Sequence, residues 1–177
     1  MKKKNLTFIT LLGITATGIA QDNAIGIRLN ENNGFGAEVT FQRDLSKENR
    51  IEANLGFKNQ GYSRYGGYSY DQREIKLTAL YHWVFDIQNG FKWFVGPGAG
   101  IGSWNTSSYY SVNNGRYEDK SGVYLIVAAN GGVEYNFDFP LRVAVDIRPE
   151  LYISSEYKDI TDRGFGPNIG VSARYRF

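Results

Sequence analysis

The side chains that could do chemistry in this sequence are acids and bases placed two residues apart. Asp146, Arg148 and Glu150 follow one another at this spacing, and Arg174 and Arg176 repeat it near the end of the chain. Paired carboxylates can act as general acid and base when their surroundings separate their pKa values. The alternative is that these acids form ion pairs with the cations between them. We favour ion pairs, and we expect no catalytic residue here.

The chain has a single histidine, His82. A histidine paired with a serine on a lipid-facing surface could cleave acyl chains, but no serine lies close to His82 in its own segment. His82 also shares the alternation of the charged residues, so we expect a buried structural histidine. The sequence contains no metal-ligand spacing, nucleophile elbow or phosphate-binding loop. We therefore expect neither a metal nor a cofactor.

The residues between the charges are apolar. In residues 165–177, apolar or aromatic side chains alternate strictly with small or polar ones. A period of two indicates a β-strand whose two faces meet different surroundings. The same alternation recurs in residues 24–30, 35–42, 51–58, 74–85, 93–102, 123–137 and 141–151, so we expect eight strands. No window after Gln21 keeps a helical period.

The charges of these strands fall on one face, and the other face holds essentially none. A lysine or arginine facing the middle of a bilayer costs ~2–4 kcal/mol, so this sorting predicts lipid outside and charges inside. A soluble barrel would show the reverse. An eight-stranded barrel is only wide enough for its own side chains or one small ligand. We predict a lumen filled by an ion-pair network of Arg28, Glu38, Glu52, Glu74, Lys76, Glu134, Arg142, Asp146, Arg148, Glu150 and Arg174. A narrow channel or a small-ligand carrier is the alternative.

Aromatic side chains gather at the strand ends next to three short connections, residues 44–49, 86–90 and 138–140. Amphipathic rings are typical of the boundary between membrane and water. The sequence predicts a girdle of Phe41, Trp83, Trp93, Tyr135, Phe137, Tyr175 and Phe177.

Longer polar stretches lie between the other strand ends, at residues 59–72, 103–121 and 154–163. We predict that they are external loops. Tyrosine among serine, glycine and asparagine is typical of adaptable binding surfaces, which makes Tyr62, Tyr65, Tyr68, Tyr109 and Tyr110 possible contact residues. Alternatively, these tyrosines only pack the loops against each other.

Three prolines leave the strand register open. Pro97 lies within an expected strand, where its missing N–H predicts a β-bulge. Pro149 and Pro167 raise the same question in the last two strands.

The chain opens Met1-Lys2-Lys3-Lys4, continues with an uncharged apolar stretch over residues 6–19 and reaches small residues at Ala20. This pattern predicts a secretory signal peptide over residues 1–20 and one domain over residues 21–177. Of 20 Lys and Arg, three lie in the signal peptide; the remaining 17 against 18 Asp and Glu give a net charge of −1. The predicted mature chain has no basic excess that would favour nucleic-acid binding. With no cysteine, disulfides are excluded.

With the export signal, the alternating strands and the terminal Tyr175-Arg176-Phe177, the chain resembles the small outer-membrane β-barrel proteins of the OmpA/OmpX type. The resemblance implies an all-β, eight-stranded antiparallel up-and-down transmembrane barrel in the bacterial outer membrane. Its turns would be short on the periplasmic side and its loops longer outside.

The resemblance also implies partners and a role. The expected partners are outer-membrane lipid and the barrel assembly machinery, which recognises the C-terminal strand; Tyr175 and Phe177 match that signal. The protein is expected to be a monomer. The expected role is non-enzymatic, in envelope integrity or surface interaction. A lipid-modifying enzyme is a less favoured alternative.

Overall fold

The computed structural model describes residues 22–31, 36–64, 68–111, 116–153 and 165–177. The regular elements are all strands: β1 (Asn23–Glu31), β2 (Ala37–Asp44), β3 (Asn49–Arg64), β4 (Tyr68–Gln88), β5 (Phe91–Ser111), β6 (Arg116–Asn136), β7 (Leu141–Ile147), β8 (Glu150–Ile153), β9 (Phe165–Gly166) and β10 (Ile169–Arg176). In these ranges, no helix is long and apolar enough to cross a membrane. The predicted signal peptide lies outside the described residues and stays a prediction.

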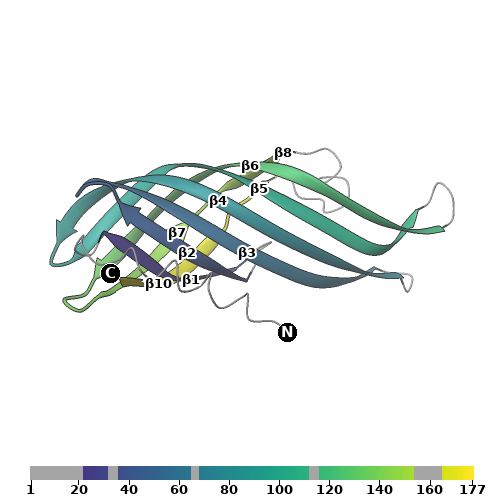
Figure 1. The fold of residues 1–177 in the computed structure, drawn as a ribbon, viewed down its shortest axis with the longest axis horizontal. Helices are drawn as coiled ribbons and strands as arrows, with labels where there is room; N and C mark the ends of the chain where they lie inside the picture. Colours follow the sequence, from purple (N-terminus) through teal and green to yellow (C-terminus); the bar gives the residue numbers. More distant parts are fainter. Residues whose placement is uncertain (1–21, 32–35, 65–67, 112–115, 154–164) are drawn as a thin grey trace, which may run out of the picture.

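The strands close into one antiparallel barrel (Figure 1). From β1 to β7, each strand pairs with the next one in the chain; β8 pairs with β6 and β9, and β10 pairs with β7. The barrel closes where β1 pairs with β10, from Ala24–Arg176 to Glu31–Ile169. The pairs β7–β8 and β9–β10 are each one long strand interrupted at a proline, so the ten segments make eight barrel strands. The predicted eight-stranded antiparallel barrel is confirmed.

The prolines interrupt the hydrogen-bond ladder without shifting it. Leu80 pairs with Gly98 and Trp83 with Val95, which is the same register on both sides of Pro97. The predicted bulge at Pro97 is therefore wrong: the missing N–H removes a ladder hydrogen bond, and the strand continues in register. The irregularities of the long strands lie at Asp86–Gln88 and at Thr106–Tyr109 instead.

Register also holds across the other two prolines. Residues 147 and 150 pair with residues 131 and 128 of β6, equal steps on both strands. Residues 146 and 150 likewise pair with residues 170 and 166.

Two of the predicted external loops are largely strand. The β3–β4 ladder continues to Arg64–Tyr68 and the β5–β6 ladder to Ser111–Arg116. The ladder between β2 and β3 ends much earlier, at Glu38–Gly56. Strands β3 to β6 therefore extend together beyond the rest of the barrel, as Figure 1 shows. We call this the hairpin end, and the opposite end, with the connections at 45–48, 89–90 and 137–140, the turn end.

Candidate functional site

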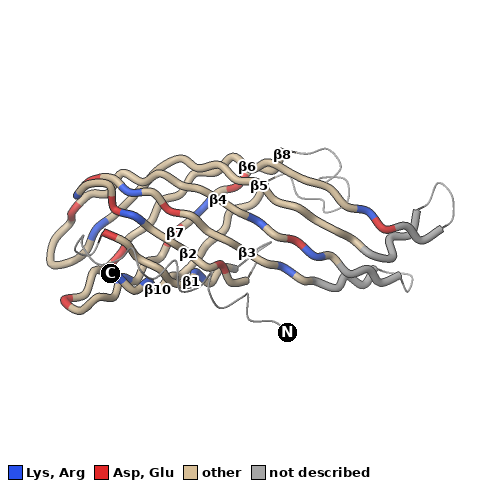
Figure 2. Tube along the Cα trace, in the orientation of Figure 1, with Lys and Arg blue, Asp and Glu red and all other residues tan. Residues whose placement is uncertain are grey.

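The alternation of side chains along each strand sorts charge to the inside of the barrel. On β1, Arg28 is 1% exposed between Ile27 and Leu29, which are 55% and 59% exposed. The same order holds on β10, where exposed Val171 precedes buried Ser172. Figure 2 shows acids and bases distributed along the strands, and burial places most of them in the lumen. An apolar outside and a charged inside is the arrangement that a barrel in lipid requires.

One group of charges surrounds Arg28. Its Nη2 lies 2.6 Å from Oδ1 of Asp146, and its Nη1 lies 3.6 Å from Oε2 of Glu38. Nη1 also donates to Oδ1 of Asn168 at 3.1 Å. The amide of Asn130 donates to Oδ1 of Asp146 at 3.1 Å. This buried pair thus has the additional hydrogen bonds that buried charges need.

A second group crosses the lumen from β4 to β8. Nζ of Lys76 lies 3.2 Å from Oε1 of Glu38 and 3.0 Å from Oε1 of Glu150. Arg148 pairs with the same two acids: with Glu38 through its Nη2, and with Glu150 at 3.0 Å through its Nε. The hydroxyl of Tyr152 donates to Oε2 of Glu150 at 2.6 Å. Two cations and two carboxylates therefore form one connected cluster.

A third group lies between β10 and β3. Nη2 of Arg174 lies 3.2 Å from Oε1 of Glu52, and its Nε donates to Oγ1 of Thr40 at 2.9 Å. Its Nη1 donates to Oγ of Ser172 at 2.6 Å. The amide of Gln42 donates to the other oxygen of Glu52. All three nitrogens of this guanidinium therefore have a partner, on β2, β3 or β10 itself.

The fourth group lies toward the turn end. Nη2 of Arg50 lies 2.6 Å from Oε2 of Glu134, and Nη2 of Arg142 lies 2.9 Å from Oδ2 of Asp44. Nε of Arg142 also approaches Glu134 at 3.6 Å. The prediction missed Arg50 and Asp44, because it began the third strand at Ile51 and ended the second at residue 42. Their positions continue the inward alternation, which was the signal that could have found Arg50.

His82 lies inside the lumen with 0% of its surface exposed. Its Nδ1 accepts a hydrogen bond from Nε of Arg50 at 3.2 Å, and its ring packs on Phe94 with centroids 4.8 Å apart. Its Nε2 is buried and makes no hydrogen bond to any of the described residues. Since this is the only histidine of the chain, a histidine–serine pair on the lipid face is excluded.

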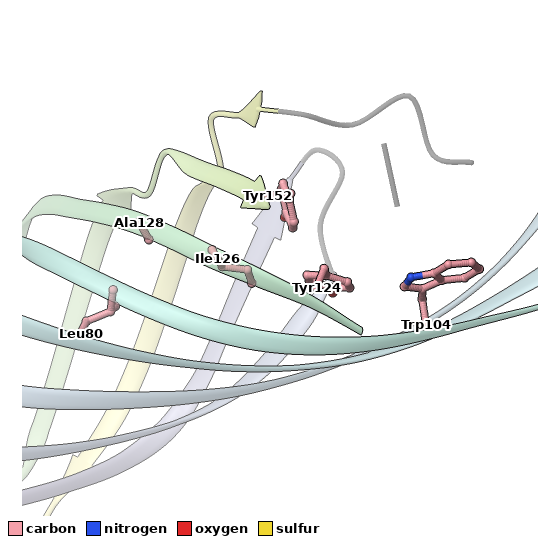
Figure 3. Packing of buried hydrophobic residues seen from close by; sticks show 6 residues of the cluster. All are labelled: Leu80, Trp104, Tyr124, Ile126, Ala128 and Tyr152. Atoms are coloured by element: carbon pink, nitrogen blue, oxygen red, sulfur yellow. The ribbon is translucent and has the colours of Figure 1, made fainter. Parts of the chain in front are cut away.

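The remaining predicted member of the network, Glu74, lies among aromatic side chains. It accepts hydrogen bonds from the amide of Gln72 and, at 3.2 Å, from the hydroxyl of Tyr124. Tyr124 meets Tyr152 edge to face at 5.5 Å. These rings belong to a buried apolar cluster inside the barrel, which Figure 3 shows: Leu80, Trp104, Tyr124, Ile126, Ala128 and Tyr152. The lumen is thus filled by ion pairs together with buried apolar side chains, which form this cluster and a second one of Val84, Phe94 and Ala144.

The predicted girdle residues lie near the turn end. Phe41, Trp83, Trp93 and Tyr175 are each between 40% and 57% exposed. Tyr135, Phe137 and Phe177 are partly exposed. Ring contacts link several of them: Trp93 with Phe85 at 4.3 Å, Tyr135 with Phe137 at 4.7 Å and Tyr175 with Phe177 at 6.5 Å. Phe91 and Phe139, which the prediction did not include, extend these contacts at the turns.

The predicted contact tyrosines fall where no side chain is described, so they remain a prediction. Tyr62 and Tyr68 belong by their backbone to β3 and β4, and Tyr109 and Tyr110 to β5. Tyr65 lies outside the described residues. Over the described ranges, no group of three His, Cys, Asp or Glu could hold a metal ion.

Comparison with known proteins identifies the fold. No protein-family model matches the sequence, and no curated protein does. Among solved structures, the chain is similar to Ail, the attachment invasion locus protein of Yersinia pestis, with 15% identity over 88% of this chain and 96% of that one and a TM-score of 0.54.

Two further structures give the same result. Outer membrane protein H of Pseudomonas aeruginosa matches with 14% identity over 88% of this chain and 99% of that one, and a TM-score of 0.57. Neisserial surface protein A matches with 11% identity over 88% and 94%, also with a TM-score of 0.57. The chain therefore has the fold of the small eight-stranded outer-membrane β-barrels.

Proposed function

We propose that this protein is a non-enzymatic outer-membrane barrel whose lumen is sealed by ion pairs and whose extended hairpins serve surface interaction or envelope integrity. The observation that carries the sealed lumen is the set of buried pairs that join strands across the barrel. Lys76 on β4 reaches Glu150 on β8, Arg28 on β1 reaches Asp146 on β7, and each charge is at most 5% exposed.

An ion that entered this lumen would have to separate charges that are already paired and hydrogen-bonded. Breaking one buried pair costs about 3–5 kcal/mol, and the lumen contains several such pairs. A steady conducting pore is therefore disfavoured against the alternative of a narrow channel. Purified protein in planar bilayers tests this: we expect no steady discrete openings, and regular single-channel steps would contradict the sealed lumen.

The surface role rests on the four strands that extend past the barrel. Beyond Gly56, β3 is no longer paired with β2, and before Leu125, β6 is no longer paired with β8. Strand edges outside the membrane present backbone N–H and C=O groups to which a partner could add. Ail, which shares this fold, is by its name an attachment protein. We propose a surface-contact role for the extended sheet of this chain as well.

This proposal fixes the orientation of the barrel, with the hairpin end outside the cell and the turn end in the periplasm. The chain has no cysteine, so single cysteines can report it. Lys120→Cys lies toward the hairpin end and Lys47→Cys in a turn, and both positions are exposed. A membrane-impermeant maleimide should label Lys120→Cys on intact cells and Lys47→Cys only after permeabilisation. The reverse labelling would overturn the orientation.

A further inference from the structure

The mouth of the barrel at the turn end contains a cup of about 440 Å³. Residues from or next to all eight barrel strands line it, so the cup is the open end of the lumen and not a groove on the outer surface. Cations outnumber acids on its wall. The cations are Lys47, Arg50, Lys92, Arg142 and Arg176. The acids are Asp22, Asp44 and Glu134, which leaves a formal charge of +2.

The floor of the cup is closed by ion pairs already described. Arg50 and Arg142 both approach Glu134, and each of the three is at most 5% exposed. Behind them lies the fully buried His82, which accepts a hydrogen bond from Arg50. A ligand could therefore enter this cup from the turn end only, and it would not pass through.

Two of the wall cations have no acid partner among the described residues. Arg176 is held by its Nη2, which donates to the carbonyls of Phe137 at 2.9 Å and Phe139 at 3.3 Å. Its Nε is buried and has no hydrogen-bond acceptor in the described part of the chain. Lys47 is exposed on the turn between β2 and β3, and it forms no ion pair with any residue that the structure describes. Lys92, by contrast, pairs with Asp86 at 2.8 Å.

A buried guanidinium N–H without an acceptor is unfavourable until an acceptor reaches it. Carboxylate and phosphate oxygens are the acceptors that arginine binds most strongly. A volume of this size also lies within the range of small-molecule sites, which is about 300–1,000 Å³. The cup thus has the room and the positive charge for an anion, and Arg176 in its wall has no acid partner among the described residues.

We propose that the cup binds a small anion bearing a carboxylate or a phosphate, with Arg176 as its main donor and Lys47 closing over it from the turn. The anion could be free in the aqueous space at the turn end, or it could be the phosphate of a lipid headgroup at the barrel rim. This inference concerns the turn end and is independent of the surface role proposed for the hairpin end.

The test is an NMR titration of the refolded full chain in maltoside micelles, which contain no phosphate. Inorganic phosphate and acetate are the probes for a free anion, and a water-soluble short-chain phosphatidylglycerol is the probe for a headgroup. We expect the Nε–H resonance of Arg176 and the backbone amide of Lys47 to shift and saturate with at least one of them. Saturation by phosphatidylglycerol alone assigns the headgroup, and saturation by the small anions assigns a free ligand.

Variants then separate a site from general charge attraction. Arg176→Gln should weaken the binding of the saturating probe about tenfold, as expected for loss of a hydrogen bond from a charged group. Lys47→Gln should weaken it by a smaller factor, and Lys120→Gln, the same change toward the hairpin end, should leave it unaltered. Should Arg176→Gln fail to fold, Lys47→Glu on the exposed turn carries the test. The proposal is overturned if no probe saturates, or if Lys120→Gln weakens binding as much as the cup variants do.

Discussion

Arg28 and Asp146 are 118 residues apart in the chain, yet Nη2 of the arginine lies 2.6 Å from Oδ1 of the aspartate inside the barrel. Both are at most 5% exposed, and Asn168 and Asn130 satisfy further polar atoms of the pair. The pair joins the first strand to the seventh, so it can form only once the barrel has closed. Stability of the closed barrel should therefore depend on it.

We predict that Arg28→Met destabilises the folded barrel by about 3–5 kcal/mol, because it leaves Asp146 buried without a cation. Urea unfolding of the protein from lipid vesicles, followed by tryptophan fluorescence, measures this. The double variant Arg28→Met with Asp146→Leu should lose less stability than the single variant, since the unpaired carboxylate at position 146 is gone. Equal losses in both would contradict a role for the pair as a unit.

The lipid-facing side can be tested at one position. Val171 is 56% exposed on β10, and its register partners Leu29 and Val145 are exposed as well. We predict that Val171→Arg lowers the free energy of unfolding by ~2–4 kcal/mol, the cost of a cation facing hydrocarbon. Val171→Ile is the control and should change it little. The same vesicle unfolding assay applies, and an arginine variant as stable as the isoleucine variant would place this position outside the lipid.

A glycine on β5 marks where the barrel wall has no room for a side chain. A Cβ on Gly96 would overlap the carbonyl oxygen of Tyr81 and lie 3.1 Å from Cα of His82, both backbone atoms of the neighbouring strand. Gly96→Ala should cost about 1–3 kcal/mol, because backbone cannot move aside as a side chain can.

The matched change is Gly131→Ala on β6, where the nearest atoms to a new Cβ lie at 3.6 and 3.8 Å. It should alter stability by no more than about 0.5 kcal/mol. Both variants are compared by their urea midpoints in the same lipid. Similar midpoints would show that the packing around Gly96 is looser than the structure indicates.

The last residue takes part in closing the barrel. The N–H of Phe177 donates to the carbonyl of Asn23 at 2.8 Å, and the N–H of Asn23 donates to the carbonyl of Phe177 at 3.2 Å. Phe177→Ala keeps both backbone bonds, whereas deletion of Phe177 removes them. If the aromatic side chain is an assembly signal, Phe177→Ala should reduce folded barrel in cells while refolding normally in vitro.

The deletion should reduce folded yield in both settings. Heat-modifiable gel mobility measures the folded fraction each time. Unchanged surface levels of Phe177→Ala would argue against a signal in this side chain.

The sequence allowed the lumen to be predicted because lipid imposes one rule on every residue of a membrane-spanning strand. A charged side chain such as Arg28 or Glu150 can be buried with partners on only one face of its strand. Its position in the alternation therefore predicts that it points into the lumen. Which acid pairs with which cation was not predictable. Lys76 meets Glu38 and Glu150 because of the shear between strands far apart in the chain, and alternation contains no information about shear.

The same rule explains the errors. The sequence predicts β3 to β6 too short, because alternation marks only the part of a strand that has an apolar face, and beyond the membrane a strand needs no apolar face. Residues 59–64 and 103–111 are strand held by ladder hydrogen bonds to their neighbours. Pro97 was predicted to bulge because local chemistry removes a hydrogen bond there. The bonds that remain to β6, with Pro97 opposite Ala129, keep the register.

The central claim is that lipid surrounds the apolar face and that charged and aromatic side chains fill the inside. The three tryptophans test it directly: Trp83 and Trp93 are 45% and 42% exposed on the outside, and Trp104 is 2% exposed in the lumen. Single-tryptophan variants, with the other two replaced by phenylalanine, are refolded into bilayers of phospholipid brominated near the glycerol end of the acyl chain. We predict strong quenching of Trp83 and Trp93 and little quenching of Trp104. Quenching of Trp104 as strong as that of the other two, or none of Trp83 and Trp93, would contradict the account.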